Sequence, residues 1–381
     1  MRGKEMTKSI VYLTFIDQYS PVYNSQVIEQ CNSLKNMGYN IKIYAFLPLS
    51  NYFQGAKQIK TRFPSSKTLP IITRLFKRRW FQLIIARFII GTVNANTIIT
   101  RSLYSAPVLA IVKALQPKLK IIYDIRGAAP EEALEYGDDK TDAQLLNTYE
   151  KLMLQNSDKQ IIVSNALRLH LQTKHKKKLN STVIPCCIKS SYIRTHISIL
   201  EATNKRTILY SKFKTLYIYS GSLTAWNFSN NFLLAINSIA NNPENGVIIL
   251  SHEKDKLEAV FNLKKSNIFI KTLAQEDISS ELAMCDYGIL LRDANITNQV
   301  ASPSKFAEYL GSGLSIIISD DLGDYSDFVR SNNCGFIFGQ TDINNLPPIS
   351  IEQRIKNTNL AQQHFTRESV SITNAYHKLL K

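Results

Sequence analysis

Short apolar runs alternate with longer stretches of helical periodicity through the first half of the chain. The runs are rich in β-branched and aromatic residues and are bounded by polar or turn-forming residues, which is typical of strands. Most of them are apolar throughout, as expected when helices cover both faces of a parallel sheet. The pattern predicts strands at 10–16, 41–46, 97–100, 120–125, 160–164 and 182–185 and helices near 24–37, 72–91, 105–116, 142–156 and 165–173.

A polar stretch without clear periodicity, residues 189–214, separates this series from a second one. The second series predicts strands at 216–222, 247–250, 267–270, 287–291, 315–319 and 335–338 and helices near 229–241, 253–264, 276–284, 303–311 and 322–331. Two consecutive series of this kind predict an α/β protein with two Rossmann-like, doubly wound parallel-sheet domains facing across a cleft. The length of 381 residues also suits two cores. We expect domains at 1–198 and 199–350, and C-terminal helices at 351–381 that could pack back across the domain junction.

Composition narrows the class of protein further. The five cysteines are odd in number and form no C-x-x-C pair, so a reducing cytosol is expected, without a disulfide framework or a zinc site. The apolar run at 9–16 lacks a small-residue cleavage site and fits a first strand better than a signal peptide. Since the sequence has no run of 18 uncharged apolar residues, we expect no membrane span.

The formal net charge is +16, and the surplus is concentrated near the N-terminus. Between Gln30 and Tyr123 there are 15 Lys or Arg and no Asp or Glu. The densest part, residues 60–90, mixes apolar side chains with Arg74, Lys77, Arg78, Arg79 and Trp80. This mixture is typical of a segment that lies on an anionic membrane surface, where each basic side chain adds about 1 kcal/mol of attraction. A solvated basic helix is the alternative. No nucleic-acid-binding motif accompanies the charge, so nucleic acid is not a predicted partner.

The stretch "SPSKFAEYLGSGLSIIIS" (302–319) places a helix start directly after a predicted strand and its loop. Ser302 is a suitable N-cap, and Pro303 suits the first turn because it has no N–H group to leave unpaired. The next N–H groups, of Ser304, Lys305 and Phe306, are then free to bind an anion together with the helix dipole. We therefore predict a phosphate site at this helix start, with Lys305 adding a positive charge.

Glu308 follows one turn later and shares a face with Ser304 and Lys305. A carboxylate beside a phosphate site is repulsive unless it binds another group, and the two hydroxyls of a ribose are suitable donors. The plainer alternative is a surface helix with a Lys–Glu pair worth about 0.3 kcal/mol.

Four stretches, "ASPSKFAEYLGSGLSIII", "YDIRGAAPEEA", "YIYSGSLTAW" and "LAMCDYGILL", occur in the order and context of a known family. Together they resemble the retaining glycosyltransferases of family 4, which have the GT-B fold and serve bacterial polysaccharide and glycan biosynthesis. The resemblance implies transfer of a sugar from a nucleotide-diphosphate sugar with retention at the anomeric carbon. A metal ion or other cofactor is not expected, because no D-x-D sequence precedes a turn and no His/Cys cluster has ligand spacing.

The resemblance also implies roles for single residues. Glu308 would hold the ribose, while the turn from Ser302 to Phe306 would approach the diphosphate. Gly221 and Ser222 would contact the donor phosphates, and Thr272 would lie beside the base. Many relatives carry an Arg and a Lys shortly after that glycine, where this chain has Thr224–Asn227, so Arg292 and Lys305 would have to neutralise the diphosphate.

Two further family features are absent from the sequence. A second glutamate, eight residues before the ribose glutamate in many relatives, is replaced by Val300, with Asp293 as the nearest substitute. The Gly-rich turn after the first strand is replaced by Asp17–Pro21.

Asp124 and Arg126 end a predicted buried strand of the first domain. By resemblance they face the reacting sugar: Arg126 could bind a phosphate or an acceptor oxygen, and Asp124 could orient it or accept a proton. The alternative is an ion pair that only fixes the loop. Glu131 and Asp286 are interpreted as structural.

These observations favour a cytosolic glycosyltransferase, peripheral on the inner face of the plasma membrane, that acts on a lipid-linked or polysaccharide acceptor. Two alternatives stay open. One is a nucleotide-sugar 2-epimerase of the same architecture, and the other is a non-catalytic membrane- or polyanion-binding protein on a degenerate transferase scaffold.

Overall fold

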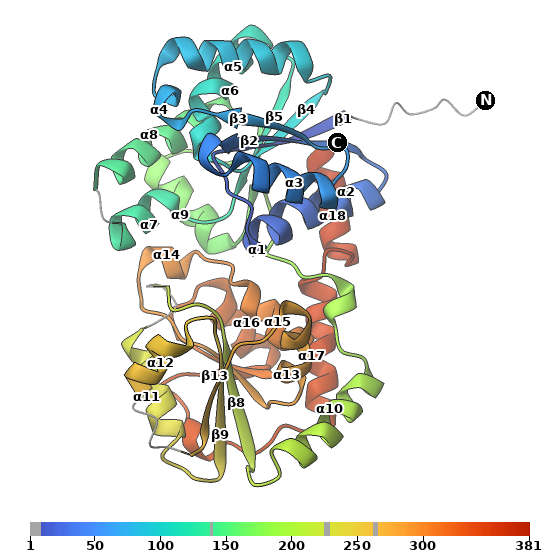
Figure 1. Ribbon diagram of the computed structural model, residues 1–381, viewed down its shortest axis with the longest axis vertical. Coiled ribbons are helices and arrows are strands. Elements are labelled where there is room, and N and C mark those ends of the chain that lie inside the picture. The colour runs from blue at the N-terminus through green and yellow to red at the C-terminus, as the bar shows by residue number, and fades with distance from the viewer. Residues whose placement is uncertain (1–8, 138–139, 225–228, 262–265) are drawn as a thin grey trace, which may run out of the picture. The chain divides into compact units, whose positions relative to one another are not determined.

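The computed structural model describes residues 9–137, 140–224, 229–261 and 266–381 (Figure 1). The chain forms two compact units, and each unit is made of segments that are not continuous in the sequence. The first unit comprises Met1–Val163, Leu167–Ile184 and Ala375–Lys381, and the second comprises Ser164–Ala166 and Pro185–Asn374. The domain limits expected from the sequence stay a prediction.

The first unit is built on a sheet of seven parallel strands. Its order is β3 (Lys67–Ile71), β2 (Asn40–Pro48), β1 (Ser9–Phe15), β4 (Thr97–Thr100), β5 (Lys120–Ile125), β6 (Lys159–Ile162) and β7 (Ser181–Val183). Its helices are α1 (Pro21–Tyr23), the π-helical turn Asn24–Ile28, α2 (Glu29–Asn36), α3 (Tyr52–Arg62), α4 (Thr73–Phe76), α5 (Arg79–Thr92), α6 (Ala106–Leu115), α7 (Ala129–Tyr136), α8 (Lys140–Asn156) and α9 (Asn165–His175).

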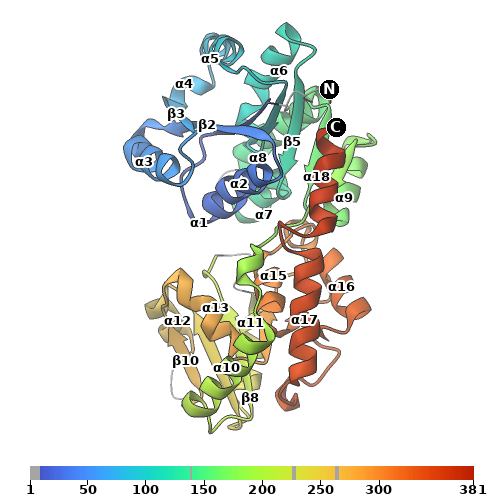
Figure 2. The same ribbon diagram turned by 90° about the vertical axis from the view of Figure 1, so that its right-hand side faces the viewer.

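The C-terminal residues of α18 (Val370–Leu380) belong to the first unit. The Nζ atom of Lys159 donates a hydrogen bond of 2.6 Å to the carbonyl oxygen of Leu379, and the Tyr39 hydroxyl lies 2.8 Å from Nδ1 of His377. These contacts attach the end of the chain to β6 and to the segment before β2. The preceding helix, α17 (Ile351–His364), belongs to the second unit, so these two helices at the end of the chain (red in Figure 2) are divided between the units.

The second unit contains six parallel strands with an equivalent order. They run β10 (Ile268–Lys271), β9 (Asn245–Leu250), β8 (Thr215–Ser220), β11 (Tyr287–Leu290), β12 (Ser315–Ile318) and β13 (Gly335–Ile337). The other helices of this unit are α10 (His196–Leu209), α11 (Asn230–Ile239), α12 (Lys254–Phe261), α13 (Gln275–Ala283), α14 (Ile296–Gln299), α15 (Ser304–Gly311) and α16 (Asp324–Asn332). The predicted α/β class with two parallel-sheet domains is confirmed.

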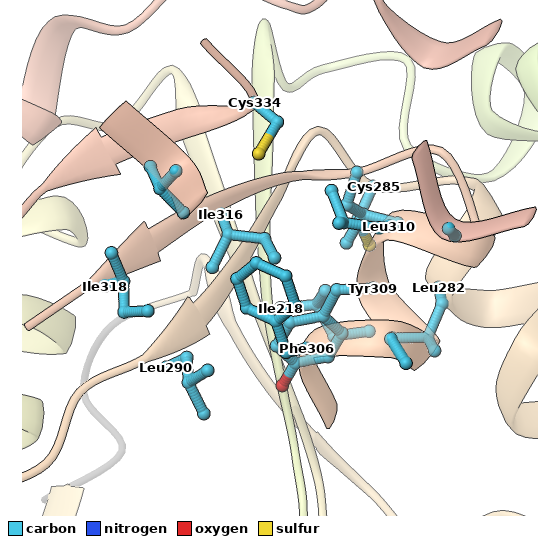
Figure 3. Packing of buried hydrophobic residues seen from close by; sticks show 14 of the residues in the cluster. Ile218, Leu282, Cys285, Leu290, Phe306, Tyr309, Leu310, Ile316, Ile318 and Cys334 are labelled. Carbon is cyan, nitrogen blue, oxygen red and sulfur yellow. The ribbon is translucent and has the colours of Figure 1, made fainter. Parts of the chain in front are cut away.

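Both faces of this second sheet are covered, which explains why its strands read as continuous apolar runs. Along β8, Leu216 and Ile218 point into a core shared with α13, α15, α16 and α17, whereas Tyr217 and Tyr219 point into another shared with α11 and α12. Figure 3 shows the first of these cores, with Phe306 and Tyr309 of α15 lying among strand residues that include Ile218, Leu290 and Ile316.

Several elements were not predicted from the sequence, among them α3, α7 and the two described next. The chain forms β3 where no strand was predicted, and Pro70 is tolerated because β3 is an edge strand. Part of the supposedly unpatterned stretch 189–214 forms α10, which buries only Ile199 and so carries almost no periodic signal. No helix of the described residues is long and apolar enough to cross a membrane.

Candidate functional site

The strand order of the second unit reverses between β8 and β11. Ligands of open α/β sheets bind outside the carboxyl ends of the strands at such a point. Gly221 and Ser222 directly follow β8, and Arg292 follows β11 by two residues. Contacts described below join these loops to Lys305 near the start of α15. The predicted donor-site residues of three separate segments are therefore brought together.

Lys305 is directed at the loop after β8. Its Nζ atom lies 3.2 Å from the hydroxyl oxygen of Tyr219 and 4.5 Å from the centroid of the Tyr219 ring. A Cβ atom added to Gly221 would lie 2.2 Å from the same Nζ atom. Burial, reinforced by the positive charge of Arg292 and opposed by Glu308, lowers the pKa of Lys305 to about 7. The site thus places two cationic groups within electrostatic range of one another, and an anionic ligand would stabilise both.

Glu308 lies one turn further along α15 and remains partly accessible. Burial raises the pKa of its carboxyl group, while the charge of Lys305 and a hydrogen bond with the Ser304 side chain lower it. Lys305 and Glu308 form no ion pair within 4 Å in this described segment. Lys305 and Glu308 therefore do not form the surface Lys–Glu pair that was the alternative expectation from the sequence.

The prediction that Ser302 is the N-cap of this helix is wrong. The N-cap residue of α15 is Pro303, and no side chain caps the helix. The Ser302 hydroxyl instead accepts the N–H group of Cys186 at 2.8 Å and is hydrogen-bonded to Tyr325. Ser302 is therefore engaged in holding the preceding turn to the segment after β7.

Of the three N–H groups that were expected to be free at this helix start, one is hydrogen-bonded. The N–H group of Phe306 donates to the carbonyl oxygen of Pro303 at 3.0 Å, and the Phe306 side chain is fully buried in the core of Figure 3. For the N–H groups of Ser304 and Lys305, no acceptor is present among the described residues. The predicted phosphate site at the start of α15 is thus reduced to two N–H groups.

Two tyrosines that were not predicted as site residues fix the loop after β8. The Tyr309 hydroxyl accepts the N–H group of Ser220 at 3.0 Å, and the Tyr219 hydroxyl donates to the carbonyl oxygen of Ser222 at 2.8 Å. A side chain at Gly288 would meet the Tyr309 ring at 2.3 Å, so this glycine makes room for the ring. The only indication of this role in the sequence was that Tyr309 belongs to the α15 stretch "FAEYL".

The other predicted donor residues are further from this point. Thr272 follows the edge strand β10, two strands away from β8, and its hydroxyl donates to the carbonyl oxygen of Ser251 at 2.7 Å. Of the stretch Thr224–Asn227, which replaces the cationic pair of relatives, residues 225–227 lie outside the described residues. The described residues contain no cluster of three or more His, Cys, Asp or Glu with metal-site geometry.

In the first unit, Asp124 is completely buried at the end of β5 and paired with Arg126. One carboxylate oxygen lies 2.7 Å from Nε of Arg126, and the other lies 2.8 Å from its NH2 atom. Tyr12 donates a hydrogen bond of 2.6 Å to the second oxygen, and the Gln30 amide lies 3.3 Å from it. Asp124 therefore orients the Arg126 guanidinium, whose side chain is 12% exposed.

The basic segment forms α4, a short turn and α5. Arg74, Lys77, Arg78, Arg79 and Trp80 are all exposed. Along α5, the exposed fractions of Trp80, Ile84 and Phe88 are 54%, 54% and 36%. Residues four apart share a helix face, so these three side chains form an exposed apolar stripe among basic residues.

No family model matches the sequence, and no curated protein matches it in sequence. The fold is shared with solved structures. HepE of Anabaena, solved with UDP and with UDP-glucose, has a TM-score of 0.71 at 12% identity over 98% of this chain and 99% of its own. Sucrose-phosphate synthase of Thermosynechococcus elongatus has a TM-score of 0.71 at 12% identity over the same shares. A glycosyltransferase of Rickettsia africae has 0.68 at 13% identity over 98% of both chains.

Identities this low establish likeness of fold and nothing beyond it, since one fold hosts many activities. The chain therefore has the two-domain parallel-sheet architecture of GT-B glycosyltransferases.

Proposed function

We propose that this protein is a retaining glycosyltransferase that uses a nucleotide-diphosphate sugar and a glycan acceptor. The observation that carries the proposal is the meeting of Lys305, Gly221 and Glu308 at the strand-order reversal of the second unit. The first two offer a cation and close main-chain approach for a diphosphate, and the third offers a carboxylate for a ribose. The HepE complexes with UDP and UDP-glucose support the choice of donor.

In the proposed reaction, the bond between the anomeric carbon and the diphosphate oxygen breaks. The acceptor hydroxyl oxygen forms a bond on the same face of the sugar, and its proton passes to the leaving phosphate. Negative charge on that phosphate is stabilised by the start of α15, Lys305 and Arg292, and the mechanism needs no metal ion. Arg126, oriented by Asp124, is proposed to contact the sugar phosphate or the acceptor oxygen.

The test is hydrolysis and transfer with a panel of UDP-, GDP- and dTDP-sugars. Glu308→Ala should lower turnover of the accepted donor about 10- to 100-fold, as expected for a lost hydrogen bond to a charged group. Glu244→Ala, which removes an exposed carboxylate of the same unit, is the matched control. Absence of turnover with every donor would favour the non-catalytic alternative. Release of a free 2-epimer would favour the epimerase.

The role of Arg126 has its own test. Arg126→Ala should lower the turnover number far more than the affinity for the donor, because its contact is proposed for the reacting sugar. The opposite pattern would assign Arg126 to donor binding.

We also propose that α4 and α5 dock the enzyme on an anionic membrane surface, in the cytoplasm, where a lipid-linked acceptor would lie. The exposed stripe of Trp80, Ile84 and Phe88 supplies apolar contact, and the adjacent basic residues supply attraction. Charge reversal of Arg78 and Arg79 to Glu should abolish binding to phosphatidylglycerol vesicles. Reversal of the exposed Lys118 and Lys151 is the charge-matched control, and equal loss in both variants would reduce the effect to net charge.

A further inference from the structure

The segment that follows β1 departs from regular backbone geometry at two places. Ile16 has φ of +60°, a left-handed conformation that is rare for a β-branched residue, and its N–H group donates to the carbonyl oxygen of Phe46 at 2.8 Å. Four residues after Ser20 the chain takes a π-helical turn at Asn24–Ile28. Such irregular elements are concentrated at functional sites. The segment also replaces the Gly-rich turn of the family with Asp17–Pro21, which has no assigned role.

This segment, the end of β2 and α3 line a pocket of about 210 Å³ that lies wholly in the first unit. The volume equals that of about seven water molecules at about 30 Å³ each, which is enough for one sugar ring. Four carboxamide side chains line it, together with an aromatic ring and a helical glycine: Gln18, Asn51, Gln54, Gln58, Tyr19 and Gly55.

The chemistry of the lining is neutral although the first unit is strongly basic. No charged side chain belongs to the lining, although the Arg62 guanidinium lies 5.8 Å from the Tyr19 ring centroid. None of the four carboxamides hydrogen-bonds another described residue. Each carboxamide offers two donors and one acceptor, which matches hydroxyl groups that both donate and accept. A polyol without charge is the ligand class that fits.

Gly55 lets α3 pack closely against two other residues of the pocket wall. It is buried within α3, and a Cβ atom there would lie 3.3 Å from Leu47 and 3.9 Å from Tyr19, both of which line the pocket. A glycine inside a helix costs about 0.5–1 kcal/mol relative to alanine. Since the backbone at Gly55 is ordinary helix, what the glycine permits is the close approach of α3 to Leu47 and Tyr19.

We propose that this pocket binds one neutral sugar ring of the acceptor glycan. The identification of the ligand as acceptor rests on the proposed function, whereas the binding itself needs no donor. The four carboxamides hold the ring hydroxyls, and Tyr19 provides apolar surface for the carbon face of the ring.

The experiment is saturation-transfer NMR of the full chain with methyl glycosides of glucose, galactose, mannose, N-acetylglucosamine and glucuronate. At least one neutral glycoside should bind, and the glucuronide should bind at least tenfold more weakly than that one. Gln18→Ala with Gln54→Ala should weaken the neutral glycoside at least tenfold, and Gly55→Leu should abolish its signal by filling the pocket. Gln144→Ala, which removes an exposed helical carboxamide near the start of α8, is the matched control.

The proposal is overturned if no neutral glycoside binds, if the glucuronide binds best, or if the double variant binds as well as the parent protein. Both glutamines are exposed and make no hydrogen bond to the described residues, so the double variant should keep the parent circular dichroism and melting temperature. Affinity for UDP separates this result from the proposed function. The pocket variants should bind UDP with the affinity of the parent protein. If the parent protein binds glycosides but no nucleotide, the proposed sugar pocket stands and the proposed transferase function does not.

Discussion

The ammonium group of Lys305 occupies the space that any side chain at position 221 would need. A Cβ atom on Gly221 would lie 2.2 Å from Nζ and 2.4 Å from Cε of Lys305. Gly221 also has φ of +156°, which residues with a side chain rarely adopt. The backbone at this position therefore favours glycine, and any side chain there would have to displace the end of the lysine that lies over it.

Gly221→Ala should displace Lys305 and weaken binding of UDP by about tenfold or more, which corresponds to about 1.4 kcal/mol. Isothermal titration calorimetry measures the loss. Gly91→Ala is the control, because a Cβ atom at Gly91 in α5 meets nothing within 4 Å. Unchanged affinity in Gly221→Ala would separate Lys305 from the nucleotide site.

Binding of UDP should become weaker as pH rises above 7. Burial, together with the charge of Arg292, lowers the pKa of Lys305 to about 7, so the free protein loses this cation above that pH. A bound diphosphate favours the charged amine, and binding above pH 7 must therefore take up a proton. The linkage predicts a decrease in affinity approaching tenfold per pH unit between about pH 7 and 9. In Lys305→Arg the guanidinium stays charged, and its affinity should be independent of pH over this range.

The fold could be predicted because it depends on features that are local in the sequence. Strands such as β5 and β12 consist largely of buried apolar residues, and their limits nearly coincide with the prediction. The elements that were missed depend on tertiary context instead. Pro70 is acceptable only because β3 is an edge strand, and α10 packs through a single buried residue, Ile199.

The charged residues of the candidate site could be predicted from the sequence, whereas the residues that hold them in place could not. The sequence placed Lys305 and Glu308 on one helix face, but it could not show that the lysine would lie against Tyr219 and Gly221. That contact joins residues 84 or more positions apart, and its distance depends on how β8 and α15 pack. The failed expectation at Ser302 has the same cause, because its hydroxyl bonds to Cys186 and Tyr325 and not to its own helix.

Among the carboxylates of the second unit, Asp286 should cost the most stability when it is replaced. It is fully buried, its carboxylate lies 2.8 Å from Arg206 and 2.9 Å from Arg354, and it accepts the N–H group of Leu216 at 2.9 Å. Asp286→Asn leaves the buried Arg354 and the half-buried Arg206 without their shared counter-charge and should cost about 3–5 kcal/mol. Urea denaturation measures this. Asp327→Asn is the control, since Asp327 is 79% exposed and its pair with Arg330 should contribute at most about 1 kcal/mol.

Acid should destabilise the first unit through Glu131. Burial alone would raise the pKa of this carboxyl group, but hydrogen bonds from His170 and Lys174 outweigh burial and hold it at about 2, below its ordinary value of 4.5. Because the pKa is lower in the folded state, the carboxylate stabilises the fold above pH 4.5, and this contribution is lost as pH falls from about 4.5 to 2. Because Glu131 is only partly buried and solvent screens its pairs, the lost contribution is on the order of 1–2 kcal/mol.

Glu131→Gln should therefore be less stable than the parent protein at pH 7 and should lose less stability between pH 5 and 3. Melting temperatures recorded by circular dichroism across this range measure the difference. Glu201→Gln, which removes an exposed carboxylate from α10, should follow the parent curve. If Glu131→Gln also runs parallel to the parent protein, the pairs that Glu131 forms with His170 and Lys174 do not stabilise the fold, and the acid sensitivity has to come from other carboxylates such as Glu150, which is paired with Lys174 and His175.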